Sequence, residues 1–169
     1  MTLRNLSLLF ISLFILAACG GGGGGSTTPP TAGCSPSTTN LCITVVGGKY
    51  VVQNSSSAGV SQKTLTLNAG TYTFDQTDSS NVTPAGAYGS ARIHQIGFST
   101  TSDGTFGGGS TYSTGVNTSG SPGSNGKTTI VIDASTPSTL YYYCVNHTGM
   151  GGTINIVIGN QSDQVEFTE

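Results

Sequence analysis

The sequence predicts an all-β protein folded as an antiparallel β-sandwich of about seven or eight short strands. Three observations lead to this prediction. From position 34 onward, apolar and polar residues alternate with a period of two in several segments, as they do in half-buried strands. No segment shows the period of a helix. Clusters of Gly, Ser, Thr and Asn separate the segments, and Gly alone supplies 26 of the 169 residues, which is expected of a domain with many turns.

The strands are expected at 41–46, 49–53, 64–67, 71–74, 91–98, 127–133, 140–144 and 152–158. A Gly-Gly dipeptide between the first two is typical of a hairpin turn. Ile154, Ile156 and Ile158 share one face of the last segment, so this strand should cover the core. The loop 99–126 is too long to be featureless in a compact domain, and 111–116 within it is therefore expected to form a short edge strand.

The N-terminal segment predicts export and anchoring. After Arg4, residues 6–16 form an uncharged apolar run, which is typical of a signal peptide and is shorter than the roughly 20 residues of a permanent membrane helix. Leu-Ala-Ala before Cys19 resembles the lipobox of bacterial lipoproteins. That resemblance implies removal of residues 1–18 and lipidation of Cys19, whose several acyl chains would hold the protein at the bacterial cell envelope, facing the periplasm or the exterior. The alternative is an ordinary secretory signal followed by a cysteine by chance.

Residues 19–33 are expected to be a flexible tether. A run of glycines at 20–25 is followed by Ser, Thr and Pro, a composition that cannot bury apolar surface and that forms a flexible coil stiffened at its far end. The folded domain is therefore expected at 34–169, a length within the usual range of a single domain.

Charge is scarce and excludes some classes of function. Lys and Arg total 5, Asp and Glu total 7, and the net charge is −2. The sequence has no basic stripe of the kind that binds nucleic acid, so no nucleic-acid partner is expected. No carboxylate pair stands beside a histidine in a hydrolytic arrangement, so we do not expect an enzyme.

The four cysteines each have an expected role. Cys19 is the predicted lipidation site. Cys34 and Cys42 are close in sequence and outside the reducing cytosol, so we expect them to form a disulfide. Cys144 then remains as a free thiol in an oxidising compartment, where a bound metal ion would protect it.

The strongest chemical signal is the spacing Cys144-x-x-His147-x-x-Met150 at the end of an expected strand. One tight loop thereby carries a thiolate, an imidazole and a thioether. This set of donors suits copper far better than calcium, magnesium or manganese. Zinc would accept the cysteine and the histidine but seldom recruits a methionine.

This segment resembles the ligand loop of the cupredoxins, the small blue-copper proteins, in the short form found in amicyanin-like members. The resemblance extends over 64–158 and implies a Greek-key β-sandwich that binds one copper ion of type 1. It also implies an upstream histidine ligand, and the only other histidine of the chain is His94. By this resemblance His94, Cys144 and His147 would form a trigonal set with Met150 as a weak axial ligand.

The sequence departs from the module it resembles at two positions. Gln95 follows the upstream histidine where that module has proline, and Phe106 stands in the Gly-rich loop where that module often carries a histidine. The first change should leave His94 able to bind metal. The second means that no role of a loop histidine can be carried over to this chain.

Three functions follow from these residues. The preferred interpretation is a membrane-anchored one-electron carrier at the cell envelope, with an unidentified redox partner protein. The second is a lipoprotein for copper scavenging, storage or delivery, in which the ion is the cargo and the partner is a copper-handling protein. The third is a metal-free adhesion or surface module, in which Cys144 is an inert buried cysteine and the other residues are part of an ordinary loop.

Overall fold

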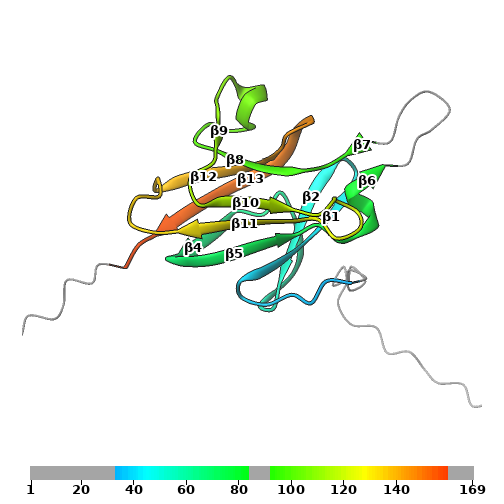
Figure 1. Cartoon of the computed structure of the whole chain (residues 1–169), viewed down its shortest axis with the longest axis horizontal. Helices are drawn as coiled ribbons and strands as arrows, with labels where there is room; N and C mark the ends of the chain where they lie inside the picture. Colours follow the sequence, from blue (N-terminus) through cyan, green and yellow to red (C-terminus); the bar gives the residue numbers. More distant parts are fainter. Residues whose placement is uncertain (1–32, 84–91, 160–169) are drawn as a thin grey trace, which may run out of the picture.

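A computed structural model of the chain describes residues 33–83 and 92–159 (Figure 1). The predicted signal peptide 1–18, the lipidation site Cys19 and all of the tether before residue 33 lie outside these ranges. Among the described residues no helix is long and apolar enough to cross a membrane.

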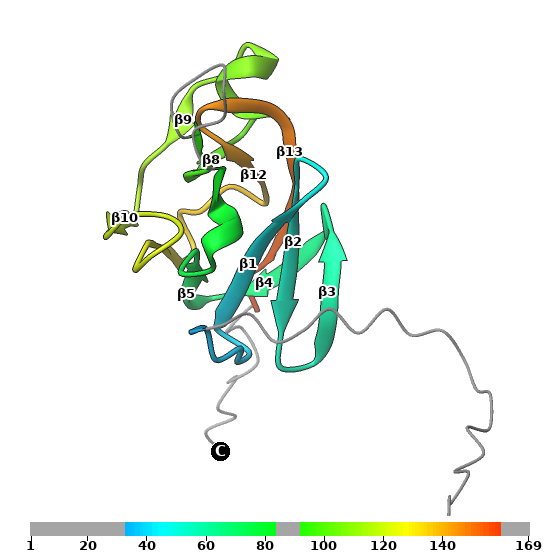
Figure 2. The same cartoon turned by 90° about the vertical axis from the view of Figure 1, so that its right-hand side faces the viewer.

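Two sheets pack face to face, and the predicted all-β sandwich is confirmed (Figures 1 and 2). The first sheet has the strand order β10 (Val116–Ser119), β11 (Lys127–Ile132), β5 (Gly70–Asp75), β1 (Asn40–Val46), β2 (Lys49–Asn54) and β3 (Ser57–Ser61). The second has the order β4 (Leu65–Asn68), β13 (His147–Val157), β12 (Thr139–Cys144), β8 (Ile96–Ser99) and β9 (Thr111–Tyr112). β6 (Val82–Thr83) and β7 (Arg92–Ile93) pair with each other as a separate two-stranded sheet, and the described residues include two 3-10 helices, η1 (Ser79–Asn81) and η2 (Gly104–Gly107).

The sheets are mixed, because two strand pairs are parallel. β1 pairs with β5 and β4 pairs with β13 in parallel, while the remaining pairs of the described strands are antiparallel. β4 and β5 follow each other in the chain but belong to different sheets, and Gly70, with φ of +147°, begins β5 directly after β4. Period-two alternation reports which face of a strand is buried. It does not report the direction of the neighbouring strand.

The structure divides two of the expected strands. The segment 91–98 contains β7 and β8, with His94 and Gln95 between them. The edge strand expected at 111–116 is replaced by β9, which pairs with β8, and β10, which pairs with β11 in the other sheet. The turn between β9 and β10 contains Gly115, whose φ of +69° favours glycine. The chain therefore crosses from one sheet to the other where one continuous strand was expected.

The core lies between the sheets and contains apolar side chains from both. Ile154 is fully buried, Ile156 is nearly so and Ile158 packs against them, as the alternation of β13 predicts. The rings of Phe74 and Phe98, one from each sheet, meet edge to face with centroids 5.1 Å apart. Each such buried side chain contributes about 1.5–3 kcal/mol through burial alone. The two sheets are thereby fixed as a rigid frame for the loops at their ends.

The predicted disulfide is confirmed. Cys34 and Cys42 are bonded, with their Cα atoms 5.9 Å apart, within the usual range for a disulfide. Cys42 belongs to β1, so the bridge ties the segment before β1 to the first sheet. Among the described residues the one free cysteine is Cys144, and it is buried.

Candidate metal centre

A two-residue hairpin brings Cys144 and His147 together. Cys144 ends β12, His147 begins β13, and the two residues are cross-strand partners. Side chains of antiparallel partners lie on the same face of a sheet. The Sγ atom of Cys144 is accordingly 3.4 Å from Nδ1 of His147.

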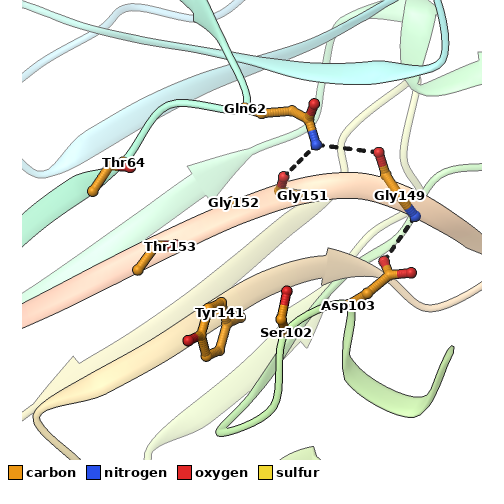
Figure 3. A pocket seen from close by; sticks show the side chains of 9 residues that line it. All are labelled: Gln62, Thr64, Ser102, Asp103, Tyr141, Gly149, Gly151, Gly152 and Thr153. Atoms are coloured by element: carbon orange, nitrogen blue, oxygen red, sulfur yellow. Dashed lines mark hydrogen bonds between the residues drawn. The ribbon is translucent and has the colours of Figure 1, made fainter. Parts of the chain in front are cut away.

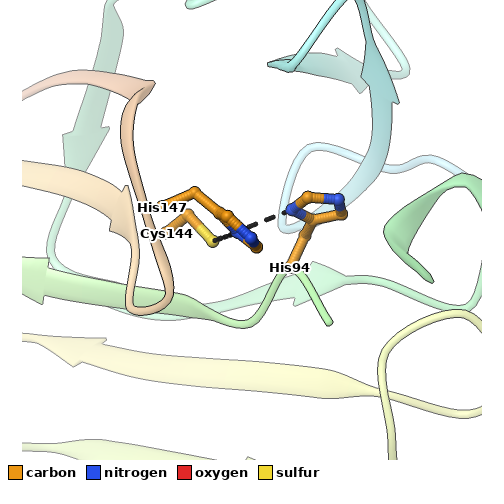
Figure 4. A group of neighbouring side chains, drawn as sticks. All are labelled: His94, Cys144 and His147. Carbon is orange, nitrogen blue, oxygen red and sulfur yellow. Dashed lines mark hydrogen bonds between the residues drawn. The ribbon is translucent and has the colours of Figure 1, made fainter. Parts of the chain in front are cut away.

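His94 reaches the same point from the neighbouring strand. Ile96 of β8 is the cross-strand partner of Cys144, so His94 lies just beyond the end of this ladder. The amide of Val145 donates to the carbonyl of Gln95 at 3.0 Å, which holds the hairpin against the segment that contains His94. Nδ1 of His94 is 4.0 Å from the sulfur of Cys144 (Figure 4).

The three side chains can hold one metal ion. One ligand atom from each of His94, Cys144 and His147 lies within 4.8 Å of the others. With ligand bonds of 2.0–2.3 Å, three donors around one ion in a trigonal arrangement are about 3.5–4.0 Å apart. Of the two nitrogen–sulfur distances, 3.4 Å lies just below this range and 4.0 Å lies at its upper end. The predicted convergence of these three residues is confirmed.

The site is shielded from water and favours a neutral His94. Cys144 is fully buried, His94 is 6% exposed and His147 is half-buried. Burial lowers the pKa of His94 below its usual 6.5, and the nearby charges of His147 and Arg92 lower it further. An imidazole must be neutral to bind a metal, so this environment keeps His94 ready to act as a ligand at neutral pH.

Thr83 contacts the second ring nitrogen of His94. Its Oγ1 atom lies 3.1 Å from Nε2 of His94, on the side of the ring opposite to Cys144. If Nε2 carries the proton and donates it to this hydroxyl, the lone pair of Nδ1 points toward the sulfur. Sequence reasoning missed Thr83, because it lies on β6 and shares no sequence pattern with the histidine.

Met150 is buried beside the same site. It is 2% exposed and lines, together with His94 and His147, a surface hollow of about 370 Å³. Its role as the fourth ligand stays a prediction. The prediction is compatible with this placement, because Met150 lines the same hollow as His94 and His147.

The backbone on either side of Met150 is held by three side chains: Lys49, which donates to the carbonyl of Gly149, and Asp103 and Gln62, which Figure 3 shows. The carboxylate of Asp103 accepts a hydrogen bond from the amide of Gly149 at 2.8 Å. The amide of Gln62 donates to the carbonyls of Gly149, at 3.2 Å, and Gly151, at 2.8 Å. These contacts hold the backbone on both sides of the methionine. Asp103 and Gln62 line a polar hollow of about 320 Å³, and none of the four predicted ligands lines this hollow.

What the arrangement can do chemically follows from its donors. A buried thiolate and two imidazoles are suited to a soft or intermediate ion such as copper or zinc, and the group could hold such an ion with little rearrangement. No protein-family model and no curated protein matches the chain. The fold and the buried His94–Cys144–His147 group are therefore the observations on which a function can be argued.

Proposed function

We propose that the protein is a cupredoxin-like, membrane-anchored type 1 copper protein that carries one electron at a time at the bacterial cell envelope. The observation that carries the proposal is the buried group of His94, Cys144 and His147 at one end of a β-sandwich. Its anchoring rests on the sequence around Cys19, and its redox partner is an unidentified protein.

Copper is favoured over zinc by the fourth donor. Zinc in a structural site is satisfied by four Cys and His ligands, and these three residues supply only three. Two histidines and one cysteine with a weak methionine are the donors of electron-transfer copper sites. Met150 is buried against the same hollow as the two histidines, so the thioether is available to complete this set.

One-electron transfer is favoured by how firmly the donors are held. A copper ion bound here would supply the change between Cu(I) and Cu(II), and the residues of the chain would keep its surroundings nearly constant. Cys144 and His147 are fixed by strand pairing, while Met150 is fixed by hydrogen bonds on both sides. Ligands that move little when the ion changes its oxidation state favour rapid electron transfer.

Copper delivery is the second candidate, and the hollow beside the site favours it. About 370 Å³ is far more than an ion requires, since one water molecule occupies about 30 Å³ in the liquid. His94, His147 and Met150 all line this space, so a second protein could approach the ion from that side.

A copper titration of the purified protein tests these functions. For the electron carrier we expect one Cu(II) per chain, an intense blue charge-transfer band and loss of that band in Cys144→Ser, because the thiolate donates the charge. Colourless and readily exchanged Cu(I) would instead support delivery. Absence of copper binding would refute both and favour a metal-free surface module.

A further inference from the structure

The peptide groups of His94 lie in the gap between β7 and β8 and are satisfied by hydrogen bonds from other parts of the chain. The amide of His94 donates to the carbonyl of Asn81 at 2.9 Å. The carbonyl of His94 accepts from the hydroxyl of Tyr50 at 2.8 Å and also from the side-chain amide of Gln76. A buried backbone group needs such a partner, because leaving it unpaired is costly.

Gln76 connects most of these partners. It follows the last residue of β5 and is fully buried. Its Nε2 donates to the Oδ1 atom of Asn81 at 3.0 Å and to the carbonyl of His94. Its Oε1 accepts from the amide of Ile96 at 3.0 Å and from the side chain of Gln95 at 3.2 Å. Four hydrogen bonds saturate a glutamine amide.

These contacts connect His94 to the rigid first sheet. Tyr50 belongs to β2, and Asn81 donates to the carbonyl of Ile43 in β1 at 2.8 Å. Gln76 is also held through its own backbone, by bonds of 2.8 Å to Gly126 and from Gly123. The histidine therefore takes its position from the sheet opposite to the one that carries Cys144 and His147.

We propose that Gln76 is the positioning residue of the metal centre, which holds the backbone of His94 so that Nδ1 faces Cys144 before a metal binds. This inference rests on the proposed function and deepens it. No hydrogen bond among the described residues joins Gln76 to the imidazole, so Gln76 acts through the backbone that follows the histidine, at the carbonyl of His94 and the amide of Ile96. The same carbonyl accepts from Tyr50, which therefore assists it.

The test compares Gln76→Leu with Ser99→Ala. Leucine keeps the approximate volume but removes all four hydrogen bonds. Ser99 is a matched control, since it is also fully buried and hydrogen bonded, to Ser110 and Thr101, but has no contact with the site. Tyr50→Phe is a milder second variant, which keeps the ring but deletes the hydroxyl that bonds the His94 carbonyl and also lies beside Cys144.

Two readouts separate positioning from general stability. Hydrogen exchange of the metal-free protein should show that the amides of His94 and Ile96 exchange faster in Gln76→Leu, relative to global unfolding, and the control should leave this ratio unchanged. Copper competition should show about 10–100-fold weaker binding with an altered Cu(II) spectrum, as for other residues that support a ligand.

Unchanged exchange at His94 and an unchanged Cu(II) spectrum in Gln76→Leu would overturn the inference. If that variant does not fold, hydrogen exchange of the His94 and Ile96 amides in Tyr50→Phe decides the question, with a smaller change expected, because the Cu(II) spectrum of that variant also reports the loss of the hydroxyl beside Cys144. A wild-type protein that binds no copper would refute the proposed function, while hydrogen exchange in the metal-free protein would still decide the role of Gln76.

Discussion

If the protein binds copper as proposed, replacing Met150 by leucine should keep the fold and the bound ion but raise the reduction potential. Met150 is 2% exposed and belongs to the apolar core, and a swap between Met and Leu that conserves volume usually costs less than about 1.5 kcal/mol. The strand should survive, because Asp103 and Gln62 hold it through the backbone of Gly149 and Gly151, which the substitution leaves in place.

The expected magnitude follows from the balance between the two oxidation states. A thioether that donates weakly to Cu(II) stabilises the oxidised form, so its loss favours Cu(I). Each tenfold change in this preference shifts a one-electron potential by about 59 mV. We expect a rise on the order of 50–100 mV from the loss of one weak ligand, which is about one to two such steps.

Spectroelectrochemistry of the copper-loaded variant measures this shift directly, with Ile156→Leu as the matched control. Ile156 is on the same strand and in the same core, but it does not line the hollow beside the two histidines. Its replacement should leave the potential unchanged. A potential for Met150→Leu equal to that of the wild type, with copper still bound, would refute the ligand role. Complete loss of copper would show that the methionine is a strong ligand, contrary to our reasoning.

Three further outcomes are expected. Cys34 and Cys42 should resist thiol labelling until a reductant is added, and their reduction should cost about 2.5 kcal/mol for a separation of 8 residues in the chain-entropy model; labelling of both without reductant would contradict this. Burial raises the pKa of Asp75, but hydrogen bonds and the Lys127 ammonium, 3.1 Å away, outweigh it and hold the pKa below 3.8. The ionised Asp75 carboxylate therefore stabilises the fold above the unfolded-state pKa of about 3.9, and this stabilisation is lost as the pH falls through the lower folded-state pKa. The stability of Asp75→Asn should consequently fall less steeply with acid than that of the wild type, as acid denaturation would show. Cys19→Ser should release the protein from membranes after export, as fractionation would show, and a cleaved variant that stays with the membrane would argue against a lipid anchor.

The sequence could predict those residues of the site that lie close together in the chain. Cys144 and His147 are three positions apart on a hairpin, so their spacing alone places them together. The assignment of His94 needed the resemblance to a known family, because no short pattern connects it to the cysteine. The structure confirms that the two meet, at 4.0 Å between sulfur and Nδ1.

The sequence predicts a strand where buried and exposed residues alternate, but it does not predict which strand will be its neighbour in the sheet. The hairpin of β1 and β2 and the apolar face of β13 follow from alternation and from a Gly-Gly turn. β3 was missed because Ser57–Ser61 consists mostly of small residues and none of them is buried, so no buried face reveals the strand. The parallel pairing of β1 with β5 depends on how the sheet is assembled, for which a strand's own sequence has no signal.

The network around Gln76 explains why the residues that support His94 left no trace in the sequence. Tyr50, Gln76, Asn81 and Thr83 come from four separate elements or their ends, and each looks like an ordinary strand or turn residue in its own segment. The role of Tyr50, Gln76 and Asn81 appears only once His94 lies in the gap between β7 and β8 and needs partners for its peptide groups, while Thr83 contacts the imidazole. A ligand placed in a regular strand would have its backbone satisfied by the ladder but its side chain confined to one face. A ligand placed in a gap gains freedom to point at the hairpin, and the fold must then supply fixed partners from the opposite sheet. Such support suits a carrier whose ligands stay in place through both oxidation states better than a protein that must release its ion.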